Sequence, residues 1–226
     1  MVNKKVGDIH AADVGAGTGI WTRQLSVAGL NVLIAVEPND AMRRVGERFS
    51  KGHAIEWRSG SGENTGLNTN SLDFLSMASS FHWVDFDRGV SELNRVLKKG
   101  GWFFALWNTR QIKGSSILED IENKIVELKP DLERVSSGAS GITTCLEQKL
   151  IECRFFDEVT YIHGYHTEHW SLDRYIGAWR SVSDVQTQLG PNKFEEFIDS
   201  IERNFRGLNQ IEVKYKTRAW AARKNR

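Results

Sequence analysis

A glycine-rich stretch near the start of the chain constrains the fold more than any other feature. Residues 13–19 read Asp-Val-Gly-Ala-Gly-Thr-Gly, so three glycines stand at alternate positions. A short apolar run precedes the stretch, and residues 20–28 can form a helix after it. Alternate glycines allow positive φ angles and let a ligand approach main-chain N–H groups, while the following helix N-terminus favours an anionic ligand group. The stretch therefore predicts a strand, a turn and a helix that cradle a nucleotide-type ligand.

The glycine spacing separates two classes of ligand. The dinucleotide fingerprint requires Gly-x-Gly-x-x-Gly, whereas the glycines here stand at positions 15, 17 and 19. An acid followed by Gly-x-Gly-x-Gly resembles the first motif of the class I S-adenosylmethionine-dependent methyltransferases, whose loop wraps the methionine half of the cofactor. A nicotinamide oxidoreductase would also need a hydride-site residue, which we do not find in the sequence. For the loop taken alone, an ordinary glycine-rich turn is the alternative.

The resemblance implies a first set of cofactor-binding residues at two strand ends. Asp13 would position the amino group of the cofactor through a charge-assisted hydrogen bond, with a cap or turn acid as the alternative. Glu37 ends the second predicted strand, near the distance of about 20 residues at which dinucleotide sites place a ribose-binding acid. It would accept both ribose hydroxyls, or it simply starts the turn at Pro38. The backbone of the loop would complete this half of the site through Gly15, Ala16, Gly17 and Gly19.

Further cofactor contacts are implied beyond the second strand. Met42 resembles the position that packs on adenine, and ordinary core packing is its alternative. The loop that follows the third predicted strand resembles one in which a small residue and an acid lie against the adenine amino group. Gly62 stands there in place of a frequent alanine, and Glu63 is the acid unless it is a solvated loop residue. Ser79 stands where relatives often carry glutamine, which leaves the side-chain part of that contact open.

The segment Phe81-His82-Trp83 is the second motif of the chain. It resembles the region after strand four in small-molecule methyltransferases grouped with the trans-aconitate enzymes, where these three residues would bind substrate beside the transferable methyl. His82 is the candidate catalytic base, because a histidine titrates near neutral pH; a hydrogen-bonded structural histidine is the alternative. Aromatic faces suit a positively charged sulfur. Further candidates for the substrate pocket, each with core burial as its alternative, are Trp107, Tyr175 and Trp179.

Strands and helices alternate through the first half of the chain, which favours a doubly wound α/β sheet. We predict strands over residues 7–13, 31–37, 53–58, 72–79, 102–107, 154–163 and 211–223. We predict helices over residues 20–28, 40–49, 90–97, 115–129, 172–183 and 192–205, and a turn over 98–101. The resemblance implies a seven-stranded, mostly parallel sheet with an antiparallel last strand between the fifth and sixth. It also implies one domain over residues 1–226, with cap helices within 112–150 and 170–206.

The chain departs from the resembled family at its start. Relatives commonly carry one or two lid helices ahead of the first strand, and few residues stand there in this sequence. Either the chain is truncated or its cofactor is more open than usual. We therefore expect weak cofactor affinity or a lid supplied by a partner subunit, which leaves a homodimer open.

Composition narrows the function further. A formal net charge of +1 and a pI of about 7.8 give no basic face for nucleic acid or an anionic membrane. Cys145 and Cys153 are expected to be free thiols, no Cys/His cluster has metal spacing, and no leader or spanning apolar run is present, so we expect a cytoplasmic protein. The sequence thus predicts in-line methyl transfer to a small carboxylate, hydroxyl or amine. The alternative is a protein that binds the cofactor and no longer methylates.

Overall fold

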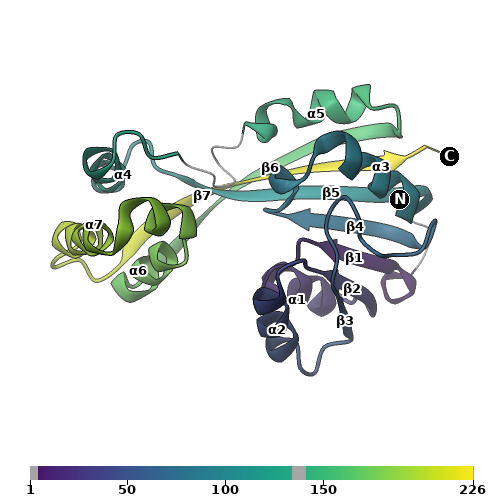
Figure 1. The fold of residues 1–226 in the computed structure, drawn as a ribbon, viewed down its shortest axis with the longest axis horizontal. Helices are drawn as coiled ribbons and strands as arrows, with labels where there is room; N and C mark the ends of the chain where they lie inside the picture. The colour runs from purple at the N-terminus through teal and green to yellow at the C-terminus, as the bar shows by residue number, and fades with distance from the viewer. Residues whose placement is uncertain (1–4, 134–140, 226) are drawn as a thin grey trace. The chain divides into compact units, whose positions relative to one another are not determined.

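The computed structural model describes residues 5–133 and 141–225. Its strands form one seven-stranded sheet in the order β3-β2-β1-β4-β5-β7-β6 (Figure 1). The strands are β1 (His10–Val14), β2 (Val32–Val36), β3 (Ile55–Arg58), β4 (Leu72–Ala78), β5 (Leu97–Gln111), β6 (Phe156–Trp170) and β7 (Ile211–Lys224). The helices are α1 (Ile20–Val27), α2 (Asp40–Phe49), α3 (Phe86–Val96), α4 (Ser116–Leu128), α5 (Ile142–Glu152), α6 (Leu172–Arg180) and α7 (Ser183–Asn204).

The strand order is that of a doubly wound sheet. Strands β1 to β5 pair in parallel along the sequence β3-β2-β1-β4-β5. Strand β7 lies between β5 and β6, and the sheet ends in antiparallel strands. The predicted fold class, including the place of the last strand, is therefore confirmed.

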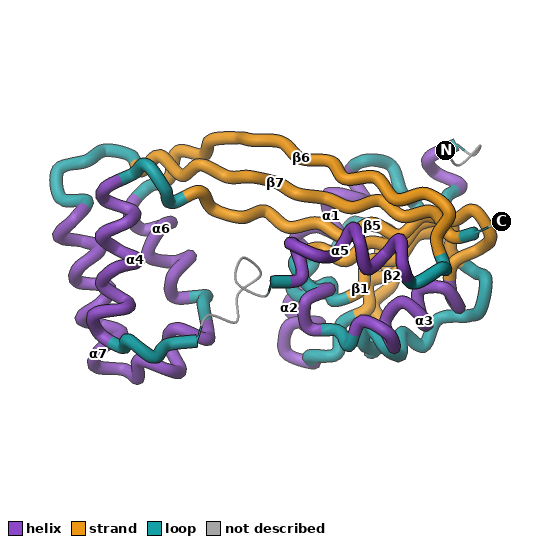
Figure 2. Tube along the Cα trace, turned by 90° about the horizontal axis from the view of Figure 1, so that it is seen from above, coloured by secondary structure: helices purple, strands orange, loops and turns teal. Residues whose placement is uncertain are grey.

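By its contacts the chain divides into two compact units. Unit 1 comprises residues 1–107, 141–163 and 218–226, and unit 2 comprises 108–140 and 164–217. Strands β1 to β4 and helices α1, α2, α3 and α5 belong to unit 1, whereas α4, α6 and α7 belong to unit 2 (Figure 2). Strands β5, β6 and β7 contribute residues to both. The predicted single domain with a helical cap stays a prediction, and residues 134–140 of the cap range 112–150 lie outside the described part of the chain.

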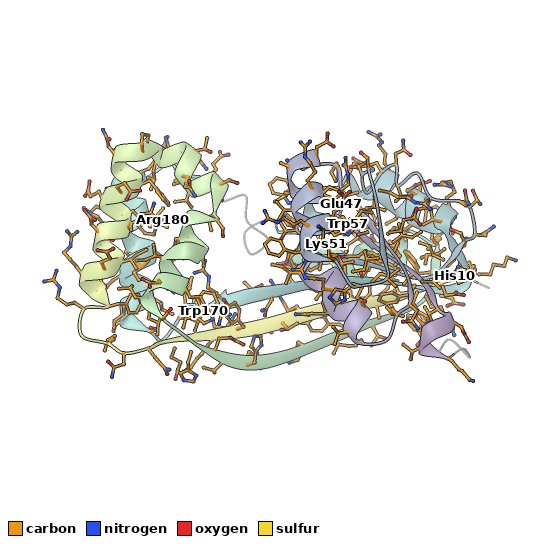
Figure 3. The ribbon with its side chains drawn as sticks, turned by 90° about the horizontal axis from the view of Figure 1, so that it is seen from below. His10, Glu47, Lys51, Trp57, Trp170 and Arg180 are labelled. Carbon is orange, nitrogen blue, oxygen red and sulfur yellow. The ribbon has the colours of Figure 1, made fainter. Side chains whose placement is uncertain are left out.

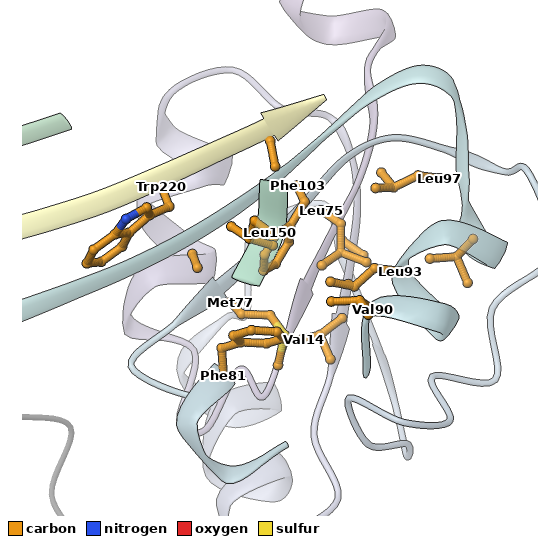
Figure 4. Close-up of a cluster of buried hydrophobic side chains, with 14 of the residues drawn as sticks. Val14, Leu75, Met77, Phe81, Val90, Leu93, Leu97, Phe103, Leu150 and Trp220 are labelled. Atoms are coloured by element: carbon orange, nitrogen blue, oxygen red, sulfur yellow. The ribbon is translucent and has the colours of Figure 1, made fainter. Parts of the chain in front are cut away.

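Two apolar layers cover the sheet of unit 1, and the pleat of β1 assigns its side chains to them. Ala11 packs with Leu25 of α1, whereas Ala12 and Val14 belong to the cluster that α3 and α5 close. Figure 4 shows part of the second cluster, including Val14. Because strand side chains alternate between faces, Asp13 shares the face of Ala11. Its carboxylate is therefore directed toward α1.

Two helices of unit 1 and strand β5 differ from the prediction. Helix α3 begins at Phe86, earlier than predicted, because Asp85 caps it by accepting the N–H of Arg88 at 3.0 Å. Helix α5 was not predicted, and its buried Leu146 and Leu150 pack in unit 1. The predicted turn over 98–101 lies inside β5, where the register shifts between Leu72 and Phe74.

Unit 2 is built around aromatic side chains of its helices. Trp179 of α6 meets Phe197 of α7 edge to face, with ring centroids 4.9 Å apart. Helix α7 starts at Ser183, and the prediction over 192–205 covers only the part beyond its kink. Gly190, with φ of 72°, and Pro191 produce that kink.

Cys145 and Cys153 are both free thiols, as predicted. Within residues 5–133 and 141–225, three or more His, Cys, Asp or Glu side chains nowhere gather in a way that could hold a metal ion. No helix in that part of the chain has the length and apolar character needed to cross a membrane.

Candidate functional site

Three predicted site segments meet where the strand order reverses. Strands β1, β2 and β4 are parallel neighbours that end at Val14, Val36 and Ala78. In open α/β sheets, ligands bind beyond the carboxyl ends of the strands at such a switch point. The structure brings together there the glycine loop (residues 13–19), Glu37 and the aromatic turn (residues 79–83).

The glycine loop is held by β2 and is open at its centre. Gly15, Gly17 and Gly19 have φ angles of 70°, 57° and 77°, which side chains rarely adopt. The N–H groups of Gly15 and Ala16 donate to the carbonyl of Val36 at 2.8 and 3.1 Å. A Cβ added at Gly17 would meet nothing within 4 Å. A ligand can therefore approach the backbone at Gly17.

Glu37 ties the loop to the end of β2. Its Oε2 accepts the N–H of Gly17 at 2.7 Å, and its Oε1 accepts the N–H of Asn39 at 2.9 Å. Glu37 is only 6% exposed. Each carboxylate oxygen has two lone pairs, so each keeps one after these bonds. The fixed carboxylate can thus accept two neighbouring hydroxyls of a ligand, and ribose binding by Glu37 stays a prediction.

Asp13 of β1 is buried and forms hydrogen bonds with side chains of α1 and β4. Its Oδ2 accepts from the Thr22 hydroxyl at 2.6 Å, and its Oδ1 accepts from the Ser76 hydroxyl at 3.1 Å. Burial raises the pKa of Asp13 to about 7, against the two hydroxyl hydrogen bonds, which lower it. Trp21 in turn donates its Nε1 proton to Ser76 Oγ at 3.1 Å. Direct contact between Asp13 and the cofactor stays a prediction.

The aromatic turn rests directly on the glycine loop. Ser79 has a positive φ of 51° and donates its N–H to the carbonyl of Leu106 at 2.8 Å. The Ser80 hydroxyl donates to the carbonyl of Val14 at 2.9 Å, and a Cβ added at Gly15 would lie 2.5 Å from Ser80 Cβ. Glycine at position 15 is therefore required by this close approach as well as by its φ angle.

Phe81 anchors the aromatic turn in the core of unit 1 (Figure 4). Its ring is 1% exposed and lies 5.2 Å from the ring of Phe103 and 6.1 Å from that of Phe86, centroid to centroid. This position fits a buried anchor, and contact of Phe81 with a substrate stays a prediction.

His82 is joined to Trp107, and both belong to unit 1. The indole Nε1 of Trp107 donates to His82 Nδ1 at 3.3 Å. Burial lowers the pKa of His82 from its ordinary value. Trp83 lies next to His82, with ring centroids 5.0 Å apart, and is 66% exposed. Three of the predicted substrate-binding residues are thus brought together.

Tyr175 and Trp179 belong to the core of unit 2. The guanidinium carbon of Arg110 lies 4.8 Å from the ring centroid of Trp179 and 5.9 Å from that of Tyr175, and both rings are buried. Burial raises the pKa of the Tyr175 hydroxyl. Their role in substrate binding stays a prediction.

The remaining candidates for cofactor binding lie on α2 and in the loop after β3. Met42 is 47% exposed. Gly62 is buried, and a Cβ there would lie 2.4 Å from a methyl of Val84, which explains why this chain has glycine rather than alanine. Glu63 Oε1 accepts the N–H of Asp85 at 3.0 Å. Cofactor contacts of these three residues stay predictions.

Sequence reasoning missed the residues that hold the site together. Thr22 lies in the first turn of α1 and Ser80 in the aromatic turn, so their places beside motif residues were the available signal. Ser76 is the β4 neighbour of Asp13, which only strand pairing reveals. Trp57, labelled in Figure 3, had no signal at all, although a Cβ at Gly19 or Gly46 would meet its ring at 2.8 or 2.1 Å.

The chain is similar to methyltransferases over part of its length. Residues 12–105 match the model of a family described as a methyltransferase domain. An uncharacterized methyltransferase of Mycobacterium tuberculosis is 40% identical over 98 residues, which are 43% of this chain and 39% of that protein. The match therefore spans well under half of the length of that relative.

Solved structures share the architecture over nearly the whole chain. A proposed type II methyltransferase from Anaeromyxobacter dehalogenans is similar with a TM-score of 0.66, covering 94% of this chain and 88% of that one at 23% identity. Phosphoethanolamine N-methyltransferase 2 of Haemonchus contortus, solved with phosphomonomethylethanolamine and S-adenosylhomocysteine, is similar with a TM-score of 0.55, covering 99% of this chain and 50% of that one at 15% identity. The fold is that of the Rossmann-like methyltransferases.

Proposed function

We propose that the protein binds S-adenosylmethionine and transfers its methyl group to a small-molecule acceptor. The hydrogen bond from Gly17 N–H to Glu37 Oε2, at 2.7 Å, carries this proposal. It unites two residues that the resemblance assigns to different halves of one cofactor, and it leaves a lone pair on each carboxylate oxygen. The family match over residues 12–105 and a neighbour of the same fold with bound S-adenosylhomocysteine support the proposal.

The residues of the chain would act mainly by binding and orientation. S-adenosylmethionine, when bound, supplies a methyl group on a positively charged sulfur that is already a good electrophile. Glu37 would hold the ribose, and the backbone at Gly17 would face the amino-acid part. The aromatic turn would place the acceptor and exclude water, since an in-line displacement depends on alignment. The exposed Trp83 offers a ring face to a cation.

We infer the class of the acceptor from the resemblance of the aromatic turn to the trans-aconitate enzymes. We propose a small molecule of the trans-aconitate type or a related carboxylate, hydroxyl or amine. A second candidate function is cofactor binding without methyl transfer. The substitution at Ser79, which is exposed and strained, favours it. Methyl transfer separates the two functions, whereas cofactor binding is common to both.

The test measures S-adenosylhomocysteine binding by calorimetry in the wild type, Glu37→Ala and the control Glu47→Gln. We expect wild-type binding, and a loss of about 10- to 100-fold in Glu37→Ala, because two charge-assisted hydrogen bonds disappear. Glu47 is exposed on α2, so its variant should bind as the wild type does. No heat from the wild type at millimolar ligand would refute the proposal.

Methyl transfer is then measured with labelled S-adenosylmethionine and a panel of small carboxylates, phenols and amines. Transfer to any member that Glu37→Ala reduces supports an enzyme. Tight cofactor binding with no transfer to the whole panel supports the second candidate.

A further inference from the structure

We propose that Trp107 fixes His82 as a neutral imidazole with its proton on Nε2, so that His82 donates a hydrogen bond to an acceptor oxygen and does not act as a general base. Trp107 is then a positioning residue, and the acceptor class is an oxyanion, above all a carboxylate. This inference rests on the proposed methyl transfer for its substrate part. Its tautomer part stands on the structure of unit 1 alone.

The hydrogen bond between the two side chains decides the tautomer. An indole Nε1–H is a donor only, so its partner must present a lone pair. The partner atom is His82 Nδ1, 3.3 Å away. A neutral imidazole carries one proton, which must then be on Nε2. A proton on Nδ1 would set two donors against each other, and burial of the ring also disfavours the imidazolium.

The surroundings of both partners hold them in place. Trp107 is fully buried, and its ring packs edge to face on Trp220 with centroids 5.6 Å apart. His82 is held by its neighbours in the chain, since Ser80 is bonded to the carbonyl of Val14 and Phe81 is in the core. The donor is therefore fixed by packing in the core, and the backbone that carries the acceptor is anchored by Ser80 and Phe81.

The tautomer of His82 decides which chemistry this side chain can perform. A general base needs a lone pair on the nitrogen that meets the acceptor, and the nitrogen left to His82 for a ligand is the protonated Nε2. A protonated nitrogen can instead donate to an oxygen that bears a lone pair or a negative charge. A carboxylate needs no base. Its oxygen forms the bond to the methyl carbon as the carbon–sulfur bond breaks, the electron pair stays on sulfur, and no proton moves.

The tautomer is tested by NMR of the ligand-free protein with ¹⁵N-labelled histidine at neutral pH. The His82 signals are those missing from His82→Asn. We expect proton coupling at Nε2 and an unprotonated Nδ1 in the wild type, and a mixture of both tautomers in Trp107→Phe, which keeps an aromatic ring but no donor. Trp102→Phe, also on β5, is the matched control and should leave the His82 pattern unchanged.

A wild-type His82 protonated on Nδ1, or on both nitrogens, would overturn the proposal, and so would an unchanged pattern in a folded Trp107→Phe. If Trp107→Phe does not fold, the wild-type spectrum decides the tautomer alone. These outcomes do not depend on methyl transfer, so they remain informative if the proposed function fails.

The role is tested by kinetics with a carboxylate acceptor. We expect His82→Ala to lose about 10- to 100-fold in kcat/KM, mostly through KM, and His82→Gln to recover part of the loss, because its amide N–H can donate. A general base for a hydroxyl or amine acceptor would behave differently. With such an acceptor, its loss would lower kcat by about 100- to 10,000-fold, equally in both variants, because an amide takes up no proton. That result would overturn the proposed role.

Discussion

The two sides of the strand tips are held together by different forces. On the side of β1 and β2, carboxylates are buried and hydrogen-bonded, with Asp13 between two hydroxyls and Glu37 between two backbone N–H groups. On the side of β4 and β5, aromatic rings pack on one another, as Phe81 does on Phe103 and Trp107 on Trp220. The first, which we call the polar side, is held together by hydrogen bonds to carboxyl groups. The second, which we call the aromatic side, is held together by the close packing of rings.

This difference predicts how each side responds to change. The buried carboxyl of Asp13 couples the polar side to pH, because its ionised form loses solvation. The aromatic side is close-packed, so it responds to added volume. The two sides meet at Gly15 and Ser80. A side chain at position 15 would meet both backbone strain and a steric contact with Ser80.

The largest expected effect is on the polar side, at Asp13. Its pKa rises from 3.8 to about 7 in the native state, so between these values the native protein holds more protons than the unfolded chain. The contribution of Asp13 to stability should therefore fall as pH rises from about 4 to about 7, by at most about 4 kcal/mol. Asp13→Asn, which cannot ionise, should remove that decline. Urea unfolding of the ligand-free protein across this pH range measures it.

The control for this experiment is Asp199→Asn, which changes an exposed carboxylate on α7. It should keep the wild-type dependence on pH. If Asp13→Asn keeps it as well, Asp13 is not the charge that links the polar side to pH.

The next effect is at the junction of the two sides. Gly15→Ala should lower the free energy of unfolding by about 3 kcal/mol, since its φ of 70° is unfavourable for alanine and the new Cβ would lie 2.5 Å from Ser80 Cβ. Gly17→Ala is the matched control, with a φ of 57° and nothing within 4 Å of the new Cβ. It should cost about 1 kcal/mol, from backbone strain alone.

Chemical denaturation of both variants measures the difference. Removing the Ser80 side chain in the double variant Gly15→Ala/Ser80→Gly should recover part of the larger loss. Equal losses at positions 15 and 17 would mean that the loop and the aromatic turn do not press on each other.

The sequence predicted unit 1 more closely than unit 2, and burial explains why. The predicted ends of the fifth and sixth strands, Trp107 and His163, are the residues at which unit 1 itself ends. Inside unit 1 these strands face a core, so their apolar pattern is readable. Around the end of the predicted sixth strand, β6 is exposed on both faces at residues 162–167, so its sequence has no alternating apolar pattern there. The bulge at residues 98–101 depends on pairing with β4, which no single segment reveals.

The residues of the candidate site also differ in how well the sequence predicts them. The motifs supplied Asp13, the glycines and Glu37, because their spacing along the chain carries the chemistry. The partners of Asp13 come from α1 and β4, and Ser76 lies beside it only through strand register. The bond between His82 and Trp107 likewise joins the aromatic turn to β5. Contacts of this kind depend on tertiary packing, and composition or spacing does not encode them.

The smallest expected effect is at Gly62, which lies in the loop after β3 and packs against Val84, the residue that follows the aromatic turn. A Cβ there would lie 2.4 Å from one methyl of Val84 and 3.3 Å from Met77 Cε, with no backbone strain. Gly62→Ala should therefore cost about 1–2 kcal/mol in unfolding free energy through overpacking alone. Gly164→Ala, where an added Cβ meets nothing within 4 Å, is the control and should be close to neutral. If Val84→Ala in the same chain restores the lost stability, the loss comes from the steric contact with Val84. If Gly62→Ala is as stable as its control, Val84 moves aside without cost, and the contrast with the polar side weakens.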